Sequence, residues 1–333
     1  MTTAPLLIGH PLASKEHARH ALLYMCRIRK FEEAVEDLFG RGMMHGTMHL
    51  SIGQEASPTG MCMALNLTDQ ITSTHRGHGH CIAKGADLTR MIAELLGKEI
   101  GYCGGRGGSM HIADVDTGNL GANGVVGGGI PIAAGAALAS KMMKSGKVVV
   151  SFFGDGAMNE GAFHEAANLA AIWKLPMILF CENNKYGMSS STEKAFAIDN
   201  LKDRALGYGI PSVNVDGNDV VAVYEQAQIA ADRARNGEGP TLIVAETYRW
   251  KGHSRSDKNL YRTKEEIEEW RLLDPIPKFV EKILESKLME QSEIDAIQAE
   301  AQDQVIAAVN EAVKAKSAEP SGLLAAVFKE ISA

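Results

Sequence analysis

The sequence GDGAMNEGAFHEAANLAAIWKLPMILFCENN, residues 154–184, decides the fold that we expect for this chain. It follows VVVSFF at 148–153, a continuous β-branched and aromatic run that is typical of a buried parallel strand. A helix-compatible segment comes next and is closed by Pro176, and MILFC at 177–181 predicts a second strand. Because a strand–helix–strand crossover returns parallel, the carboxyl ends of both strands should point the same way.

Polar residues stand at both of these strand ends. Asp155 follows the first strand and Asn184 follows the second, so we expect them to meet in the crevice where open α/β sheets bind ligands. A carboxylate and an amide oxygen suit Mg²⁺, which shares hard oxygen ligands with phosphates. Gly154 and Gly156 let the backbone approach such phosphates, and the following helix start offers free N–H groups to an anion. Asp-Gly and Asn-Asn are common turn dipeptides when taken alone, so the joint spacing carries the prediction.

Strands and helices alternate along most of the chain, which predicts an α/β fold with a mostly parallel sheet flanked by helices. Residues 1–45 should form an N-terminal helical segment, 46–262 the α/β domain and 263–333 a helical C-terminal region. The expected strands are 71–74, 148–153, 177–181, 213–217 and 241–247, and the expected helices outside the crossover include 14–40, 88–97 and 219–236.

The C-terminal region shows a helix start and an apolar end. Thr263 with Glu266 predicts a capping box that opens the first of several charged helices. The segment 320–332 is apolar enough to dock on this chain or on a partner.

Two other segments allow more than one interpretation. Glycine is dense from 101 to 129, which favours backbone lying against a cofactor over a flexible hinge. Pro131 then occupies the first turn of an alanine-rich helix. The basic run Arg27, Arg29 and Lys30 is interpreted as solvated surface, with a partner contact as the alternative.

Composition excludes several classes of protein. A chain of 333 residues with 45% hydrophobic content can bury a large core, and its formal charge of −7 argues against a general nucleic-acid binder. No apolar run approaches the roughly 20 residues that cross a bilayer, and the first residues lack the features of a signal or transit peptide. Five scattered cysteines without a CxxC pair fit reduced thiols. We therefore expect a cytoplasmic protein that binds neither membrane nor nucleic acid.

The chain resembles the alpha subunit of the thiamine-diphosphate-dependent, decarboxylating first component of 2-oxo acid dehydrogenase complexes, in the pyruvate and acetoin branch. GDG followed two to three dozen residues later by NN is the thiamine-diphosphate signature of that family. The resemblance extends from about residue 20 to 275. The matching segments are HLSIGQEA (49–56), RGHGHCIAKG (76–85), GGRGGSMHIAD (104–114), GANGVVGGGIP (121–131), the GDG to NN stretch with KYG (185–187), and YRWKGHSRSD (248–257).

The resemblance implies thiamine diphosphate and Mg²⁺ as cofactors. Asp155, Asn184 and the backbone carbonyl of Tyr186 should hold the metal ion and, through it, the diphosphate. Gly156 and Ala157 should flank the diphosphate.

Four further positions are implied to contact the cofactor. Gly124 and Val126 match positions that line it, with Val126 against the aminopyrimidine, although core packing is an equal alternative for this valine. Arg76 should reach the phosphates with its planar donor fork. His75 replaces the tyrosine that pyruvate members usually carry there and can still donate to a phosphate.

Two histidines are implied to be catalytic. His49 matches the histidine that reaches the substrate pocket, where an imidazole suits proton transfer, and His253 matches one on a loop that closes over the diphosphate. Ser254 occupies a position that is phosphorylated in some members, and we interpret it as unmodified. A zinc site formed by His75, His78 and His80 is disfavoured, because structural zinc sites have four ligands and cysteine-rich spacing.

The implied activity is oxidative decarboxylation of pyruvate, or cleavage of acetoin, with reductive acyl transfer to a lipoyl group of the acyltransferase core. The cofactor supplies this chemistry, and the protein binds the cofactor and removes it from water. The glutamate that activates the cofactor comes from a beta subunit in this family. The resemblance thus implies two alpha and two beta chains, with this chain inactive alone.

Other functions remain open at this point. A nicotinamide-dependent Rossmann dehydrogenase is disfavoured, because no GxGxxG follows a first strand with an acid about 20 residues on. A non-catalytic subunit that only holds cofactor and a transketolase-type half enzyme are further alternatives. Features of both pyruvate-type and acetoin-type members occur, so the substrate is left open between them, and a two-carbon acyl donor is favoured over branched-chain acids.

Overall fold

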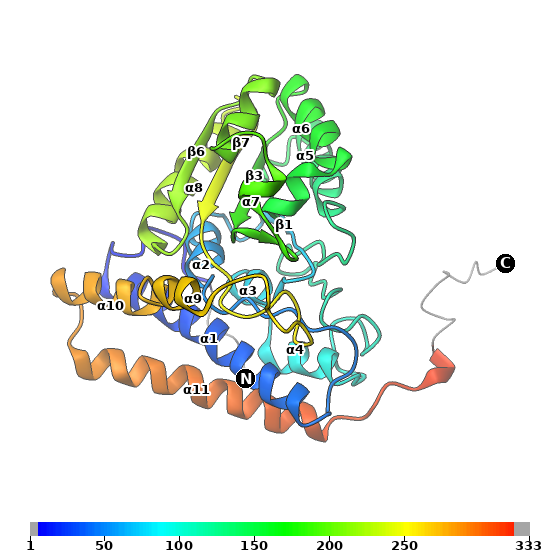
Figure 1. Ribbon diagram of the computed structural model, residues 1–333, viewed down its shortest axis with the longest axis vertical. Coiled ribbons are helices and arrows are strands. Elements are labelled where there is room, and N and C mark those ends of the chain that lie inside the picture. The colour runs from blue at the N-terminus through cyan, green and yellow to red at the C-terminus, as the bar shows by residue number, and fades with distance from the viewer. Residues whose placement is uncertain (1–5, 323–333) are drawn as a thin grey trace.

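The computed structural model describes residues 6–322, and its centre is a five-stranded sheet in which all paired strands run parallel (Figure 1). The strand order is β1-β2-β3-β7-β6. The prediction of a mainly parallel sheet flanked by helices is therefore confirmed. The strands are β1 (Gln70–Thr72), β2 (Val149–Gly154), β3 (Met177–Asn183), β6 (Ser212–Asp216) and β7 (Thr241–Glu246).

Helices cover both faces of the sheet. On one face, α5 (Gly129–Met143) and α6 (Gly161–Ile172) pack their alanines against side chains such as Phe153. On the other face, α8 (Val220–Arg235) packs against β3, β6 and β7, and the next residue of β2, Phe152, stacks on the ring of His80. Successive strand residues point to opposite faces, so a sheet buried on both sides needs the continuous apolar runs that the sequence shows.

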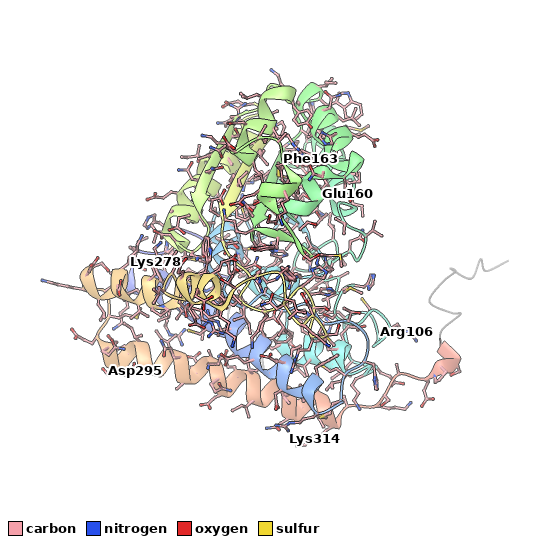
Figure 2. All side chains as sticks on the ribbon, in the orientation of Figure 1. Arg106, Glu160, Phe163, Lys278, Asp295 and Lys314 are labelled. Carbon is pink, nitrogen blue, oxygen red and sulfur yellow. The ribbon has the colours of Figure 1, made fainter. Side chains whose placement is uncertain are left out.

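A helical layer lies beneath the sheet and contains most of the remaining long helices. In Figure 1, α11 (Gln291–Lys314) runs along α1 (Lys15–Gly40), and Figure 2 labels Asp295 and Lys314 toward the two ends of α11. The other helices are α2 (Ala56–Met63), α3 (His78–Ala83), α4 (Leu88–Leu95), α7 (Thr192–Ala195), α9 (Lys264–Arg271) and α10 (Pro275–Glu285), and the short elements are η1 (Asp155–Asn159), η2 (Leu201–Tyr208), η3 (Pro320–Gly322), β4 (Tyr186–Gly187) and β5 (Ser190–Ser191).

The basic run on α1 is not solvated surface, so that interpretation was wrong for its two arginines. Arg29 pairs with the fully buried carboxylate of Glu55 and also with Asp274, which opens α10. Arg27 is buried as well and donates to Gln304 of α11 at 2.6 Å. These partners join α1 to the helical layer, whereas Lys30 pairs with nearby Glu33.

The predicted capping box forms only in part. The Thr263 hydroxyl accepts from the backbone N–H of Glu266 at 3.1 Å, as expected. The Glu266 carboxylate, however, accepts from the hydroxyls of Tyr186 at 3.0 Å and Tyr248 at 2.7 Å. A residue assigned to helix capping thus ties α9 to the hairpin that follows Asn184.

The glycine-dense segment is used in two ways, and its prediction as a cofactor lining is wrong for residues 101–108. From 101 to 108 the backbone wraps the buried carboxylate of Glu94, which accepts N–H bonds from Cys103, Gly105, Gly107 and Gly108 at 2.7–3.1 Å. From 123 to 129 the segment does line a cavity at the sheet edge. The alanine-rich helix begins at Gly129, so Pro131 is its third residue.

The described chain ends beside the glycine-rich segment. Ala318 donates to the carbonyl of Gly97 at 2.9 Å, and Gly322 lies close to Arg106, which Figure 2 labels on the side of the C-terminal segment. Residues 323–332, most of the predicted docking tail, lie outside the described residues. Within residues 6–322, no helix combines the length and apolar character that crossing a membrane requires.

Candidate functional site

The carboxyl ends of β2 and β3 meet as the sequence predicts. Gly154 is in register with Glu182, so Asp155 and Asn184 follow neighbouring strand ends and line one cavity of about 240 Å³. Asp155 opens the short η1, however, and α6 begins only at Gly161. The expected helix N-terminus is therefore displaced from the GDG turn.

Most of the predicted site residues line this cavity. They are His75, Arg76, Val126, Asp155, Gly156, Ala157, Asn184, Tyr186 and His253. Gly124 does not line it, and a Cβ there would lie 3.3 Å from His111. His49 lies behind the lining, with its ring centroid 4.6 Å from that of His75 and 5.0 Å from that of His253.

Three oxygen donors at the strand ends form a set that fits a hard divalent cation. Asp155 is only 2% exposed, and burial raises the pKa of its carboxyl to about 6. The side-chain oxygen Oδ1 of Asn184 is buried and accepts no hydrogen bond within the described chain. The third oxygen is the backbone carbonyl of Tyr186. A buried acceptor without a donor is costly, and a cation would satisfy it.

Two glycines let the hairpin close over Asp155. A Cβ on Gly187 would lie 3.3 Å from the Cα of Gly156 and 3.9 Å from Oδ2 of Asp155. The backbones at these positions therefore approach each other more closely than side chains would permit. This close approach keeps the carbonyl of Tyr186 near the carboxylate.

His49, His75 and His253 form an imidazole cluster beside these oxygens. Burial, reinforced by the charge of Arg76, lowers the pKa of His49 to about 3, of His75 to about 2 and of His253 to about 4. All three rings are therefore neutral near pH 7. Their ring nitrogens lie within 4.8 Å of one another, but the nearby guanidiniums disfavour a cation there and favour an anion.

Two buried arginines supply that positive charge. Arg76 donates to the carbonyls of Leu50 at 2.6 Å and His253 at 2.9 Å. Arg249 donates to the carbonyl of Tyr186 at 3.4 Å and to the hydroxyl of Tyr261 at 2.7 Å. Burial lowers the pKa of both, to about 9 for Arg76. Partly desolvated guanidiniums with planar donor forks suit a diphosphate.

The loop that carries His253 is fixed by an acidic residue. Asp257 accepts from the backbone N–H of His253 and from the hydroxyl of Tyr261, both at 2.7 Å. Ser254 contacts the hydroxyl of Ser256 at 3.1 Å. The loop thus reaches the cavity through His253 while Ser254 bonds within the loop.

The other two histidines of the THRGHGH segment are buried away from the imidazole cluster. His78 lies between Glu32 and Ser109, at 2.9 Å from each. His80 lies between Glu182 at 3.1 Å and Ser73 at 2.8 Å. His75, His78 and His80 therefore take different partners.

Sequence reasoning missed three buried residues at the site. Arg249 lies within YRWKGHSRSD, and Glu182 directly precedes the Asn-Asn pair, yet neither was singled out. Gln54 contacts Asn184 and lies within HLSIGQEA, but it was not singled out either. Burial of these polar residues next to the strand ends is the signal that identifies them, and it requires the fold.

Comparison with known proteins gives a consistent picture. A family model described as "Dehydrogenase E1 component" matches residues 24–321. The chain is 54% identical over 242 residues, 73% of each protein, to the alpha subunit of acetoin:2,6-dichlorophenolindophenol oxidoreductase of Bacillus subtilis (strain 168). It is 45% identical over 305 residues to the protein of the same name in Cupriavidus necator, covering 91% of this chain and 92% of that one. It is 39% identical over 291 residues to the pyruvate dehydrogenase E1 component subunit alpha of Rhizobium meliloti, covering 87% and 84%.

Proposed function

The chain belongs to the dehydrogenase E1 component family, and from this premise we propose that it is the alpha subunit of a thiamine-diphosphate-dependent oxidoreductase that cleaves acetoin. The names of two relatives, at 54% and 45% identity, support acetoin as the substrate. Relatives named as pyruvate dehydrogenase subunits, at 37–41% identity, support pyruvate as the second candidate. His75, at a position where pyruvate members usually carry tyrosine, favours acetoin as the substrate.

The observation that carries the proposal is the set of oxygens at the ends of β2 and β3. Asp155, the side-chain oxygen of Asn184 and the carbonyl of Tyr186 would hold Mg²⁺. Gly156 and Ala157 would flank the diphosphate. When bound, thiamine diphosphate would supply the nucleophilic carbon and accept the electrons of the broken bond.

The remaining residues of the site would bind and orient the cofactor and exclude water from it. Arg76 and the neutral imidazoles of His75 and His253 would donate hydrogen bonds to phosphate oxygens. Val126 would present an apolar surface to the aminopyrimidine. His49, neutral at pH 7, would take the proton from the hydroxyl of acetoin as the carbon–carbon bond breaks.

Two partners complete the proposed enzyme. A beta subunit would supply the glutamate that activates the cofactor, in an assembly of two alpha and two beta chains. A lipoyl-bearing acyltransferase would accept the two-carbon acyl group. Both partners are supported by family membership.

Reconstitution with the beta chain tests the proposal. We expect reduction of 2,6-dichlorophenolindophenol with acetoin, dependent on thiamine diphosphate and Mg²⁺, and weaker reduction with pyruvate, 2-oxobutyrate or 3-methyl-2-oxobutanoate. Asp155→Ala or Asn184→Ala should abolish Mg²⁺-dependent cofactor binding and leave the circular dichroism spectrum unchanged. Unaltered cofactor affinity in either variant would contradict the assignment, and faster turnover of pyruvate would select the second candidate.

A further inference from the structure

The amide of Asn184 contacts a second buried amide, that of Gln54. Asn184 donates through Nδ2 to Oε1 of Gln54 at 3.4 Å, and the two residues are 130 positions apart. Gln54 is 1% exposed and lies directly before the N-cap of α2, and Asn184 is 7% exposed. The contact therefore joins the α2 start to the end of β3 inside the core.

Both amides have an unpaired end. Oδ1 of Asn184 and Nε2 of Gln54 are buried and make no hydrogen bond within the described chain. A side-chain amide offers an acceptor at one end and a donor at the other, and its partners decide which end points where. The acceptor of Gln54 takes up the donor of Asn184, so the oxygen of Asn184 is the end left for a ligand.

The backbone around Gln54 is held from several sides. Its N–H donates to the carbonyl of Ser51 at 3.0 Å, and its carbonyl accepts from the hydroxyl of Ser57 at 3.1 Å. The same hydroxyl contacts Glu182 at 2.5 Å, and the carbonyl of Glu182 accepts from the backbone N–H of Asn184 at 3.0 Å. Gln54 and Asn184 are thus both tied to Glu182.

We propose that Gln54 is a positioning residue, whose side-chain carbonyl holds the Asn184 amide with its oxygen toward the divalent cation. The inference rests on the proposed function, since it requires a cation at Asn184. If both amides turned over, Nε2 of Gln54 would donate to Oδ1 of Asn184, and the NH₂ group of Asn184 would face the cation. The number of hydrogen bonds between the amides is the same in both arrangements, so the cation favours the arrangement with the Asn184 oxygen outward, and Gln54 stabilises that arrangement by accepting from the NH₂ group of Asn184.

Three substitutions in the enzyme reconstituted with its beta chain test this role. Gln54→Met keeps the size of the side chain and removes the acceptor, so we expect Mn²⁺ to bind about tenfold more weakly in the presence of thiamine diphosphate. Gln54→Glu keeps an acceptor oxygen, and we expect its Mn²⁺ affinity to stay within about threefold of the wild type. Asn184→Asp offers an oxygen in either orientation, so in this background Gln54→Met should cause no further loss.

Mn²⁺ affinity, measured by electron paramagnetic resonance, is the readout, and the melting temperature reports on folding. Wild-type affinity in Gln54→Met, or an equal loss in Gln54→Glu and Gln54→Met, would overturn the positioning role. A full additional loss in the Asn184→Asp background would overturn it too. If the wild-type complex itself binds no Mn²⁺, or binds it unchanged with Asn184→Ala, the proposed function fails rather than the role of Gln54 alone.

Discussion

Asp155 shows at the scale of one residue how a binding site lowers the stability of the empty protein. Its carboxyl is almost fully buried, and burial raises its pKa from 3.8 to about 6 although Arg249 and Lys185 act in the opposite direction. As pH rises above 3.8 the unfolded chain loses this proton first. The ionised carboxylate therefore destabilises the fold increasingly up to about pH 6 and constantly above it.

Asp155→Asn should accordingly stabilise the protein without cofactor and weaken cation binding. We expect the free energy of unfolding at pH 7 to rise by about 1–2 kcal/mol, and this gain to disappear near pH 4. Urea unfolding at both pH values measures it. Exposed Asp116→Asn is the control, and a loss of stability at pH 7 in Asp155→Asn alone would contradict the argument.

The imidazole cluster predicts a second pH dependence of stability, opposite in direction to that of Asp155. The pKa values of His49, His75 and His253 lie at about 3, 2 and 4, below the ordinary value of 6.5. Below pH 6.5 the unfolded chain binds protons that the folded chain refuses, so stability should fall as pH falls from 6.5 toward 4.

His75→Tyr should make this decline shallower, because one of the three titrating rings is gone. The slope of the unfolding free energy between pH 6.5 and 4.5 should decrease by up to about 1.4 kcal/mol per pH unit. Denaturation of the cofactor-free protein at several pH values measures the slope. His45→Asn removes an exposed ring as the comparison, and an equal slope in the wild type and His75→Tyr would refute the cluster's role.

At the scale of an element, the carboxylate of Glu94 holds the glycine-rich loop 103–108 in its conformation. Four backbone N–H groups converge on its carboxylate, so the loop conformation depends on this one acceptor pair. Glu94→Gln replaces one acceptor oxygen by a donor and leaves two of these groups without partners. We expect a loss of about 2–4 kcal/mol and faster amide hydrogen exchange confined to the loop.

Two glycines of this loop offer a matched comparison. A Cβ at Gly105 would lie 2.5 Å from the carbonyl carbon of Gly97, whereas one at Gly108 would meet nothing within 4 Å. Both have positive φ, so Gly108→Ala should cost about 1–2 kcal/mol and Gly105→Ala clearly more. Equal costs would mean that the loop is not packed as the structure shows.

The elements also show what a sequence can and cannot predict. The sequence predicts the five sheet strands to within about two residues, because buried parallel strands require continuous apolar runs. The direction of the chain in the crossover is enough to predict that Asp155 and Asn184 lie at neighbouring strand ends. The ion pairs of Arg29 could not be predicted from local sequence, since its partners Glu55 and Asp274 lie 26 and 245 positions away. Glycine density likewise indicated a bound group, but nothing local distinguished the carboxylate of Glu94 from a cofactor.

The whole molecule presents an apolar surface beside the cavity mouth. Val125 and Val126 line the cavity and are also exposed. In addition, α5, α6 and the residue that follows α6 expose a set of large apolar residues: Ile132, Met142, Met143, Leu169, Ile172 and Trp173. Exposed patches of large apolar side chains mark interaction sites. We expect the beta subunit to cover this surface and so to close the cavity.

Ile132→Glu and Ile172→Glu test this expectation at the scale of the assembly. A carboxylate on a buried apolar interface is desolvated without a partner, so each variant should bind the beta chain at least about tenfold more weakly. Analytical ultracentrifugation of mixed chains measures the affinity, and the fluorescence of Trp173 should shift to the blue on assembly with the wild type. Ile229→Glu alters an exposed isoleucine on α8, across the sheet, and should assemble normally. Unimpaired assembly of the α5 and α6 variants would contradict this expectation, because the beta subunit would then bind elsewhere and would not close the cavity from this side.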